Sequence, residues 1–275
     1  MGLPDRSEVH SQVTVCVKTF LRDQHVINCV QNVREYFPKV RIIVADDGEP
    51  AQRKTRVMEK FEVEHHMLPF GVGLSFGRNF MLDRVETEYA LVIDDDILLT
   101  EDTRVEDMFQ LLEKADIVGG ALRDRGRMIN YEGTFELADR ELRMSRTLPD
   151  EFSKYRGIRY QPAHFVLNLL AVRASTLRDL RWDDRFRIAY EHIDLFMRAY
   201  DARLEVIYAP DSIFEHARSA FPTTSKYRQH RQSKESRPIF FEKWGITRVC
   251  NLQGHVETIE GVKQVVRKRR KVTQP

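Results

Sequence analysis

The sequence predicts a single α/β domain in which helices flank a mostly parallel central sheet. Short apolar runs rich in β-branched residues alternate along the chain with segments whose apolar residues recur at helical spacing. Strands that alternate with helices form parallel sheets covered on both faces. The 275 residues are enough for one large core. We expect a flexible N-terminus at residues 1–12, the domain at 13–249 and a C-terminal extension with a basic tail at 250–275.

In the first half of the chain the alternation is regular. A helix follows the first strand, with an apolar face from Val26 to Phe37, and Pro38 ends it. Pro50 opens the next turn or helix, another helix follows Gly73, and a third spans about Asp102–Lys114. The predicted strands are Val13–Phe20, Arg41–Ala45, Val63–Leu68, Tyr89–Leu99 and Ile117–Leu122.

The second half is less regular. From about Asp124 to Gln161 the chain is polar and rich in arginine, which indicates a flexible insertion or an acceptor-side loop. A buried strand is predicted at Phe165–Val172, a helix begins near Glu191, and another strand covers Leu204–Tyr208. The apolar pair Ile213 and Phe214 then leads through Glu215 to His216.

Composition narrows the possible partners. Lys plus Arg is 44 and Asp plus Glu is 42, a net charge of +2 that does not favour a polyanionic partner for the whole surface. The basic run Arg267–Lys271 is interpreted as a solvated end, with binding to nucleic acid, an acidic glycan or an anionic membrane as the alternatives. We expect no specific nucleic-acid partner. The sequence leaves the oligomeric state open.

No apolar run approaches the length of a membrane span, so we expect no transmembrane segment in this chain. The chain as given is therefore expected to be soluble. If the full-length product carries an N-terminal anchor, its place is the Golgi lumen, and otherwise the cytoplasm.

Three consecutive carboxylates, Asp94, Asp95 and Asp96, follow the apolar run that begins at Tyr89. If the strand continues through them, Asp94 and Asp96 share one face with Cα atoms roughly 6–7 Å apart, and Asp95 faces the other way. Adjacent anions at a nearly dry strand end either take up protons or hold a cation, for which Mn²⁺ or Mg²⁺ is the simplest choice. The alternative is a solvated strand end.

Other side chains join this candidate site. Asp46 and Asp47 end the second strand, and ligands in such sheets bind outside the carboxyl ends of strands. Arg78 lies one turn into the helix after Gly73, where it can meet a phosphate. Glu191 and Asp194 lie on one face at a helix start, as a general base or as acids that favour the helix dipole. His216 is a metal ligand or a structural histidine.

The order of these blocks resembles the GT-A glycosyltransferases, and most closely the β1,4-N-acetylgalactosaminyltransferases of ganglioside and Sda-type glycans. The resemblance covers residues from about Val13 to Trp244. It rests on Lys18-Thr19-Phe20-Leu21-Arg22, Ala45-Asp46-Asp47, Met67-Leu68-Pro69-Phe70-Gly71, Gly77-Arg78-Asn79, Asp94-Asp95-Asp96, Val118-Gly119-Gly120-Ala121-Leu122-Arg123, Val166-Leu167-Asn168, His192-Ile193-Asp194 and Glu215-His216-Ala217.

This resemblance implies a GT-A (Rossmann-like) domain that binds a UDP-sugar and Mn²⁺, with Mg²⁺ possible. It also implies roles for individual residues. Thr19, Phe20 and Asp46 hold the uracil, Asp47 and Arg78 support the nucleotide or its phosphates, Asp94 contacts the ribose or a metal-bound water, and Asp95 belongs to the donor-binding group. Asp96 and His216 ligate the metal, and Asp194 is the catalytic base, with Glu191 as the rival.

The resemblance further implies an enzyme that inverts the anomeric carbon in one displacement. The expected function is metal-dependent transfer of a sugar, N-acetylgalactosamine in the first instance, from a UDP-sugar to a hydroxyl of a glycan or glycolipid acceptor. The alternatives are the same fold with UDP-galactose, UDP-glucose or UDP-N-acetylglucosamine, a non-catalytic nucleotide-sugar-binding or glycan-binding module, and a phosphoesterase. The phosphoesterase is disfavoured because a nucleophile motif and a second metal cluster are missing from the sequence.

Overall fold

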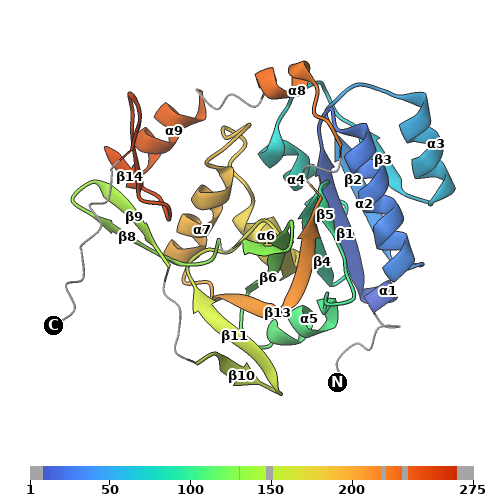
Figure 1. The fold of residues 1–275 in the computed structure, drawn as a ribbon, viewed down its shortest axis with the longest axis horizontal. Coiled ribbons are helices and arrows are strands. Elements are labelled where there is room, and N and C mark those ends of the chain that lie inside the picture. Colours follow the sequence, from blue (N-terminus) through green and yellow to red (C-terminus); the bar gives the residue numbers. More distant parts are fainter. Residues whose placement is uncertain (1–8, 130, 147–150, 218–220, 231–234, 265–275) are drawn as a thin grey trace.

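The computed structural model describes residues 9–129, 131–146, 151–217, 221–230 and 235–264. Within these residues an 11-stranded mixed sheet forms the centre (Figure 1). Its strands are β1 (Val13–Thr19), β2 (Arg41–Asp46), β3 (Glu64–Met67), β4 (Tyr89–Asp94), β5 (Ile97–Leu98), β6 (Ile117–Asp124), β7 (Arg127–Ile129), β10 (Ser153–Tyr155), β11 (Ile158–Ala163), β12 (Leu170–Arg173) and β13 (Val206–His216).

The strand order is β10-β11-β13-β6-β12-β4-β1-β2-β3, and β5 pairs with β13 and β7 with β6. Strands β3, β2, β1 and β4 are parallel neighbours, β6 and β13 form a second parallel pair, and β12 runs antiparallel between β4 and β6. The predicted α/β fold with a mostly parallel sheet is therefore confirmed. Strands that run in one direction end at one edge, so β1, β2, β4, β6 and β13 deliver their last residues to a common edge.

Helices cover both faces of the sheet. Val13, Val15 and Val17 of β1 pack with α2 and α5, whereas Cys16 packs on the opposite face with α4, α6 and α7. This alternation follows the period of two in a strand. The helices are α1 (Val9–Gln12), α2 (Asp23–Tyr36), α3 (Gln52–Lys60), α4 (Leu74–Leu82), α5 (Val105–Leu111), α6 (Ala174–Leu180), α7 (Glu191–Asp201), α8 (Ser225–His230) and α9 (Ser236–Lys243).

A second sheet of five strands, in the order β16-β15-β14-β9-β8, lies beside α7 and α9 (Figure 1). It joins two distant parts of the chain, because β9 pairs in parallel with β14. The expected domain boundary at residue 249 falls inside β14, and the segment after it continues this sheet. Its strands are β8 (Thr134–Ala138), β9 (Glu141–Ser145), β14 (Arg248–Cys250), β15 (His255–Thr258) and β16 (Gly261–Gln264).

The prediction of a flexible insertion at Asp124–Gln161 is wrong for the residues described there. They form β7 to β11, and Phe135, Leu142 and Met144 bury their side chains in the core shared with α7. These strands escaped detection because each is only three to six residues long, too short to give a clear period. The strand expected at Phe165–Val172 is also shorter, since β12 begins only at Leu170.

The aspartate run departs from the expected strand as well. Strand β4 ends at Asp94, Asp95 and Asp96 form a turn, and β5 begins at Ile97. The alternation of strand faces therefore stops at Asp94. The backbone turn instead sends Asp95 and Asp96 in similar directions, which the contacts below confirm.

Near the ends of the chain, residues 9–12 of the expected flexible N-terminus form α1. Residues 1–8 and the basic run Arg267–Lys271 lie outside the described residues. Across the described part of the chain, the helices are all too short or too polar to cross a lipid bilayer.

Candidate active site

A cavity of about 660 Å³ opens at the edge of the sheet where the parallel strands end. Five of the residues predicted to bind the donor, and both predicted metal ligands, lie in its wall. These are Thr19, Phe20, Asp47, Asp94, Asp95, Asp96 and His216. The predicted crevice at the carboxyl ends of the strands is therefore present.

Asp96 and His216 meet in this wall. His216 Nε2 lies 3.3 Å from Asp96 Oδ2. Strand pairing brings them together, because β5 and β13 are antiparallel and place His216 opposite Ile97. The backbone N–H of Ala217 also donates to the carbonyl of Asp96 at 2.7 Å. Two residues far apart in the sequence are thus held at one point by backbone geometry.

Arg22 binds the turn that carries Asp95 and Asp96. Its guanidinium lies 2.8 Å from Asp95 Oδ1 and 2.7 Å from Asp96 Oδ2, and all three side chains are buried. Thr19 Oγ1 donates to Asp95 Oδ2 at 2.7 Å. Burial raises the pKa of Asp95 to about 7 against the attraction of Arg22. Burial by itself would also raise the pKa of Asp96, but hydrogen bonds from His216 and Arg22 hold that pKa below the usual range.

These residues fit a divalent ion in part. A carboxylate oxygen and an imidazole nitrogen are ligands that Mn²⁺ accepts, and two adjacent ligands of an octahedral ion with bonds of about 2.1 Å lie about 3.0 Å apart. The observed distance is 3.3 Å. Among the described residues no group of three or more His, Cys, Asp or Glu side chains is arranged to hold a metal. An ion on Asp96 and His216 would take its other ligands from a diphosphate and water, and would share Asp96 with Arg22.

Aromatic side chains gather at another part of the cavity. The ring of Phe20 lies 5.4 Å from that of Phe70 and 5.6 Å from that of His230. Tyr227 of α8 lies over the guanidinium of Arg22 at 5.5 Å. Phe20, Tyr227 and His230 all line the cavity. Flat rings of this kind are suited to stack on a nucleobase.

The two aspartates after β2 have different surroundings. Asp46 is fully buried outside the cavity wall, 2.5 Å from Lys54 Nζ and 3.2 Å from His65 Nε2, and it accepts the N–H of Gly48 at 2.8 Å. Asp47 lines the cavity, pairs with Lys18 and accepts the N–H of Gly73 at 2.8 Å. In this structure Asp46 shapes the turn below the cavity, and Asp47 reaches its wall.

Arg78 connects two candidate acids. Its guanidinium lies 2.8 Å from Asp94 Oδ1 and 3.3 Å from Glu191 Oε1. The arginine itself is only 1% exposed and does not line the cavity, so in this structure its charge is directed at Asp94 and Glu191 and not at the cavity. Burial raises the pKa of Glu191, although Arg78 opposes this. Glu191 Oε2 has no hydrogen-bond partner among the described residues.

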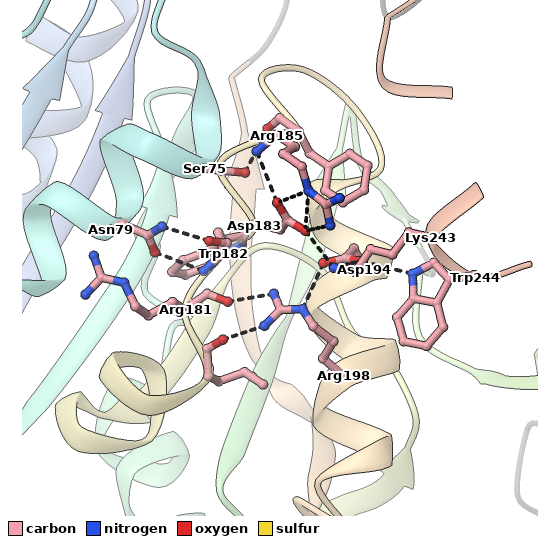
Figure 2. A network of polar contacts seen from close by, with 12 residues as sticks. Ser75, Asn79, Arg181, Trp182, Asp183, Arg185, Asp194, Arg198, Lys243 and Trp244 are labelled. Carbon is pink, nitrogen blue, oxygen red and sulfur yellow. Dashed lines mark hydrogen bonds and ion pairs between the residues drawn. The ribbon is translucent and has the colours of Figure 1, made fainter. Parts of the chain in front are cut away.

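Asp194, predicted as the base, lies outside the cavity wall and is fully buried. Its carboxylate contacts Arg198 Nε at 2.9 Å, Lys243 Nζ at 2.7 Å and Trp244 Nε1 at 3.0 Å (Figure 2). Although Asp194 and Glu191 lie three residues apart on one face of α7, the carboxylate of Asp194 points toward Lys243 and Trp244 at the end of α9. Its role as a base stays a prediction. Glu191 also lies outside the cavity wall, but its Oε2 is without a hydrogen-bond partner among the described residues, which favours Glu191.

Among the cavity-wall residues to which the sequence analysis assigned no role are Lys18, Arg22, Asn168 and His192. Lys18 and Arg22 stand in the block at the end of the first strand, and their signal was a pair of cations at the edge where the aspartates of other strands are expected. His192 and Asn168 stand in blocks that carry the family resemblance, but neither was given a role. In the amide orientation that satisfies both partners, Asn168 donates to His192 Nδ1 at 2.7 Å and accepts from Arg78 at 2.9 Å. Burial and Arg78 lower the pKa of His192 to about 3, so its imidazole is neutral.

Comparison with known proteins gives a consistent result. The family described as "Glycosyl transferase family 2" matches residues 14–173. The chain is 30% identical over 239 residues to Beta-1,4 N-acetylgalactosaminyltransferase 1 of Mus musculus, covering 82% of this chain and 43% of the relative. It is 37% identical over 123 residues to Beta-1,4 N-acetylgalactosaminyltransferase 2 of the same species, covering 44% and 23%. The chain thus spans less than half the length of these relatives.

Solved structures with the same fold include S. aureus TarS 1-349. Its complex with UDP matches with a TM-score of 0.55 and 15% identity, covering 85% of this chain and 65% of that one. Its complex with UDP-GlcNAc matches with a TM-score of 0.52 and 15% identity, covering 80% and 64%. At this identity the likeness concerns the fold.

Proposed function

The chain belongs to glycosyl transferase family 2, and on that premise we propose that it transfers N-acetylgalactosamine from UDP-N-acetylgalactosamine to a hydroxyl of a glycan or glycolipid. The donor sugar is taken from the names of the mouse relatives. The proposal of a UDP-sugar is also supported by TarS, which has this fold and was solved with UDP and with UDP-GlcNAc.

One observation carries the proposal: Asp96 and His216 lie 3.3 Å apart in the wall of a cavity of about 660 Å³. A cavity of this size lies in the range that holds a cofactor-sized or drug-sized ligand. The aromatic group of Phe20, Phe70 and His230 would receive the uracil, and the acidic turn would face the diphosphate. In this arrangement Thr19 and Asp95 support the turn, and Asp47 and Asp94 face the nucleotide.

Asp96 and His216 would hold Mn²⁺, or Mg²⁺ in its place. A bound ion supplies positive charge that offsets the charge developing on the departing diphosphate. Without that charge the carboxylates of Asp94, Asp95 and Asp96 would repel a diphosphate. Arg22, which pairs with Asp95 and Asp96, and Arg78, which pairs with Asp94, offset part of this negative charge.

We assign the base to Glu191. Its Oε2 is without a hydrogen-bond partner among the described residues, and burial raises its pKa toward the range useful for proton transfer near neutral pH. The next residue, His192, lines the cavity. Asp94, which also lines the cavity, is joined to Glu191 through Arg78.

The reaction in this proposal is one displacement with inversion. The acceptor oxygen forms a bond to the anomeric carbon while the bond from that carbon to the diphosphate oxygen breaks. Glu191 takes the hydroxyl proton, and UDP leaves with the electron pair. Arg78 orients Glu191 and balances its charge before the proton arrives.

The test is a panel of UDP-N-acetylgalactosamine, UDP-N-acetylglucosamine, UDP-galactose and UDP-glucose, each with Mn²⁺ and a glycan array, with products read by mass spectrometry. Transfer from UDP-N-acetylgalactosamine, lost in the Asp96→Asn variant, is the expected result. Preference for another sugar would correct the donor only. Tight UDP binding without transfer or hydrolysis on any acceptor would instead identify a binding module.

A further inference from the structure

Asp194 stands at the centre of a buried polar network that joins three elements (Figure 2). Arg198, one turn later in α7, contacts Asp194 Oδ2, and Lys243 and Trp244 at the end of α9 contact Oδ1. Lys243 Nζ also lies 2.7 Å from Asp183 Oδ2. The carboxylate therefore links α7 to α9, and through Lys243 to the segment that precedes α7.

That segment, the Arg181–Arg187 loop, is fixed on both sides. Arg198 donates to the carbonyls of Leu180 and, at 2.6 Å, Arg181. On the opposite side the side chain of Asn79 in α4 exchanges two hydrogen bonds with the backbone of Trp182, at 2.8 and 2.9 Å. Figure 2 shows the loop held between α4 and α7 by these contacts.

The loop leads directly into the cavity wall. The carbonyl of Arg187 accepts the N–H of Leu74 at 2.8 Å, and Arg187 Nε donates to the carbonyl of Gly71 at 3.1 Å. Gly71, Leu74 and Arg187 all line the cavity. Arg78, which contacts Asp94 and Glu191, lies in α4 between Ser75 and Asn79, and both of these side chains bind the loop.

We propose that Asp194 is a positioning residue: its ion pair with Lys243 fixes the Arg181–Arg187 loop, and the loop in turn sets the cavity wall at Arg187 and the place of Arg78. This inference rests on the proposed transferase function of the same cavity. It gives Asp194 a role that needs no contact with substrate, in agreement with its complete burial.

The charges agree with this role. Two acids, Asp183 and Asp194, meet Lys243 between them, and Arg185 pairs with Asp183 at 2.7 Å. Hydrogen bonds from Arg185, and then from Lys243, hold the pKa of Asp183 below its usual range. Removing Asp194 takes the carboxylate away from Arg198 and leaves Lys243 paired with Asp183 alone, so α7 and the loop lose the buried charge that joins them.

The experiment compares Asp194→Asn, Lys243→Gln and the double variant, with Lys39→Gln as an exposed lysine control. Backbone hydrogen exchange of residues 181–187 is measured without any ligand, and transfer kinetics are measured across pH. Trp244→Phe serves as a milder variant if Asp194→Asn does not fold. It keeps an aromatic ring but removes the indole N–H that donates to Asp194.

Positioning predicts faster exchange in the loop for both single variants and a loss of transfer on the order of 100-fold, the cost expected for a small misplacement away from the reacting atoms. The double variant should lose little more than either single variant, because the two residues act through one contact. In all three variants the rate of transfer should still fall at low pH as it does in the parent, which is the acid limb of the pH profile. Lys39→Gln should match the parent.

The opposite pattern overturns the inference. If Asp194→Asn abolishes transfer and its acid limb while loop exchange is unchanged and Lys243→Gln behaves as the parent, Asp194 acts as the base. Unchanged loop exchange in both variants also overturns it. If the parent protein transfers no sugar, the proposed function fails, and the exchange data still decide whether the ion pair fixes the loop.

Discussion

His216 Nε2 and Asp96 Oδ2 face one another at 3.3 Å, although one stands at the end of β13 and the other in the turn after β4. The antiparallel pairing of β5 with β13 produces this contact through the backbone. Because it does not depend on either side chain, substitution of one residue should leave the other in place.

This predicts separable effects on metal and nucleotide. His216→Ala and Asp96→Asn should each weaken Mn²⁺-supported UDP binding by at least about tenfold, since each removes one of two protein ligands. Calorimetric titration of UDP with and without Mn²⁺ measures this. Chelation of the metal should reduce the parent to the level of the variants. Equal affinity in the presence and absence of Mn²⁺ would remove the metal role of both residues.

Glu191→Gln should slow transfer by about 10²–10⁴-fold, the usual contribution of a positioned proton acceptor. Burial raises the pKa of Glu191, and only the ionised form accepts a proton. The rate of the parent should therefore fall as the pH drops through a value above the ordinary glutamate pKa of about 4.3. Steady-state kinetics across pH measure this fall in rate on the acid side.

UDP binding is the control for this variant, because Glu191 does not line the cavity. Glu191→Gln should bind UDP as the parent does. Near-normal transfer by this variant would return the role of base to Asp194 or to another group.

Gly73→Ala should destabilise the protein and deform the cavity wall. Gly73 has φ of +101°, and an added Cβ would lie 2.6 Å from the Cα and the carbonyl oxygen of Arg187. We expect a loss of about 1–3 kcal/mol in the free energy of unfolding, measured by denaturant titration. Gly126→Ala is the matched control, since its φ is +75° but nothing lies within 4 Å of the added atom. Equal losses in both variants would mean that backbone conformation, not the contact with Arg187, is responsible.

Asp46→Asn should cost about 3 kcal/mol in the free energy of unfolding, because it removes the fully buried carboxylate that pairs with Lys54 and leaves that lysine with the partly exposed Asp23. Asp83→Asn, which breaks an exposed pair with Arg181, should cost about 1 kcal/mol or less. Thermal or denaturant unfolding compares the two. A smaller loss for Asp46→Asn than for Asp83→Asn would contradict the structural role of Asp46.

The same pair predicts a dependence on pH. Burial would raise the pKa of Asp46, but hydrogen bonds from His65 and Lys54 hold it below its usual value. A carboxyl with a lowered pKa stabilises the fold above its unfolded value of about 3.9 and loses this contribution as the pH falls below it. The free energy of unfolding of the parent should therefore fall between about pH 5 and pH 3. That of Asp46→Asn should change less over the same range.

Much of the fold was present in the sequence. The alternation of β-branched runs with helical spacing predicted β1, α2, β2, β4 and the start of α7, because the strands are continuous apolar runs buried on both faces and the helices bury one periodic face. It also predicted that strand ends carry Asp46, Asp47, Asp94 and His216. The second sheet could not be predicted, since β9 and β14 pair across about a hundred residues and neither strand is long enough to give a clear period.

The sequence by itself determined which chemical groups reach the edge of the sheet, because the end of a strand is a local property. Only the tertiary structure decided what each carboxylate contacts there. Arg22 binds Asp95 and Asp96, Lys54 binds Asp46, and Lys243 binds Asp194. A buried carboxylate must find a cation or a donor wherever the packed chain brings one, and that partner can come from any distance along the sequence. Asp194 was thereby directed away from the cavity, while Asp96 and His216 were brought together in its wall.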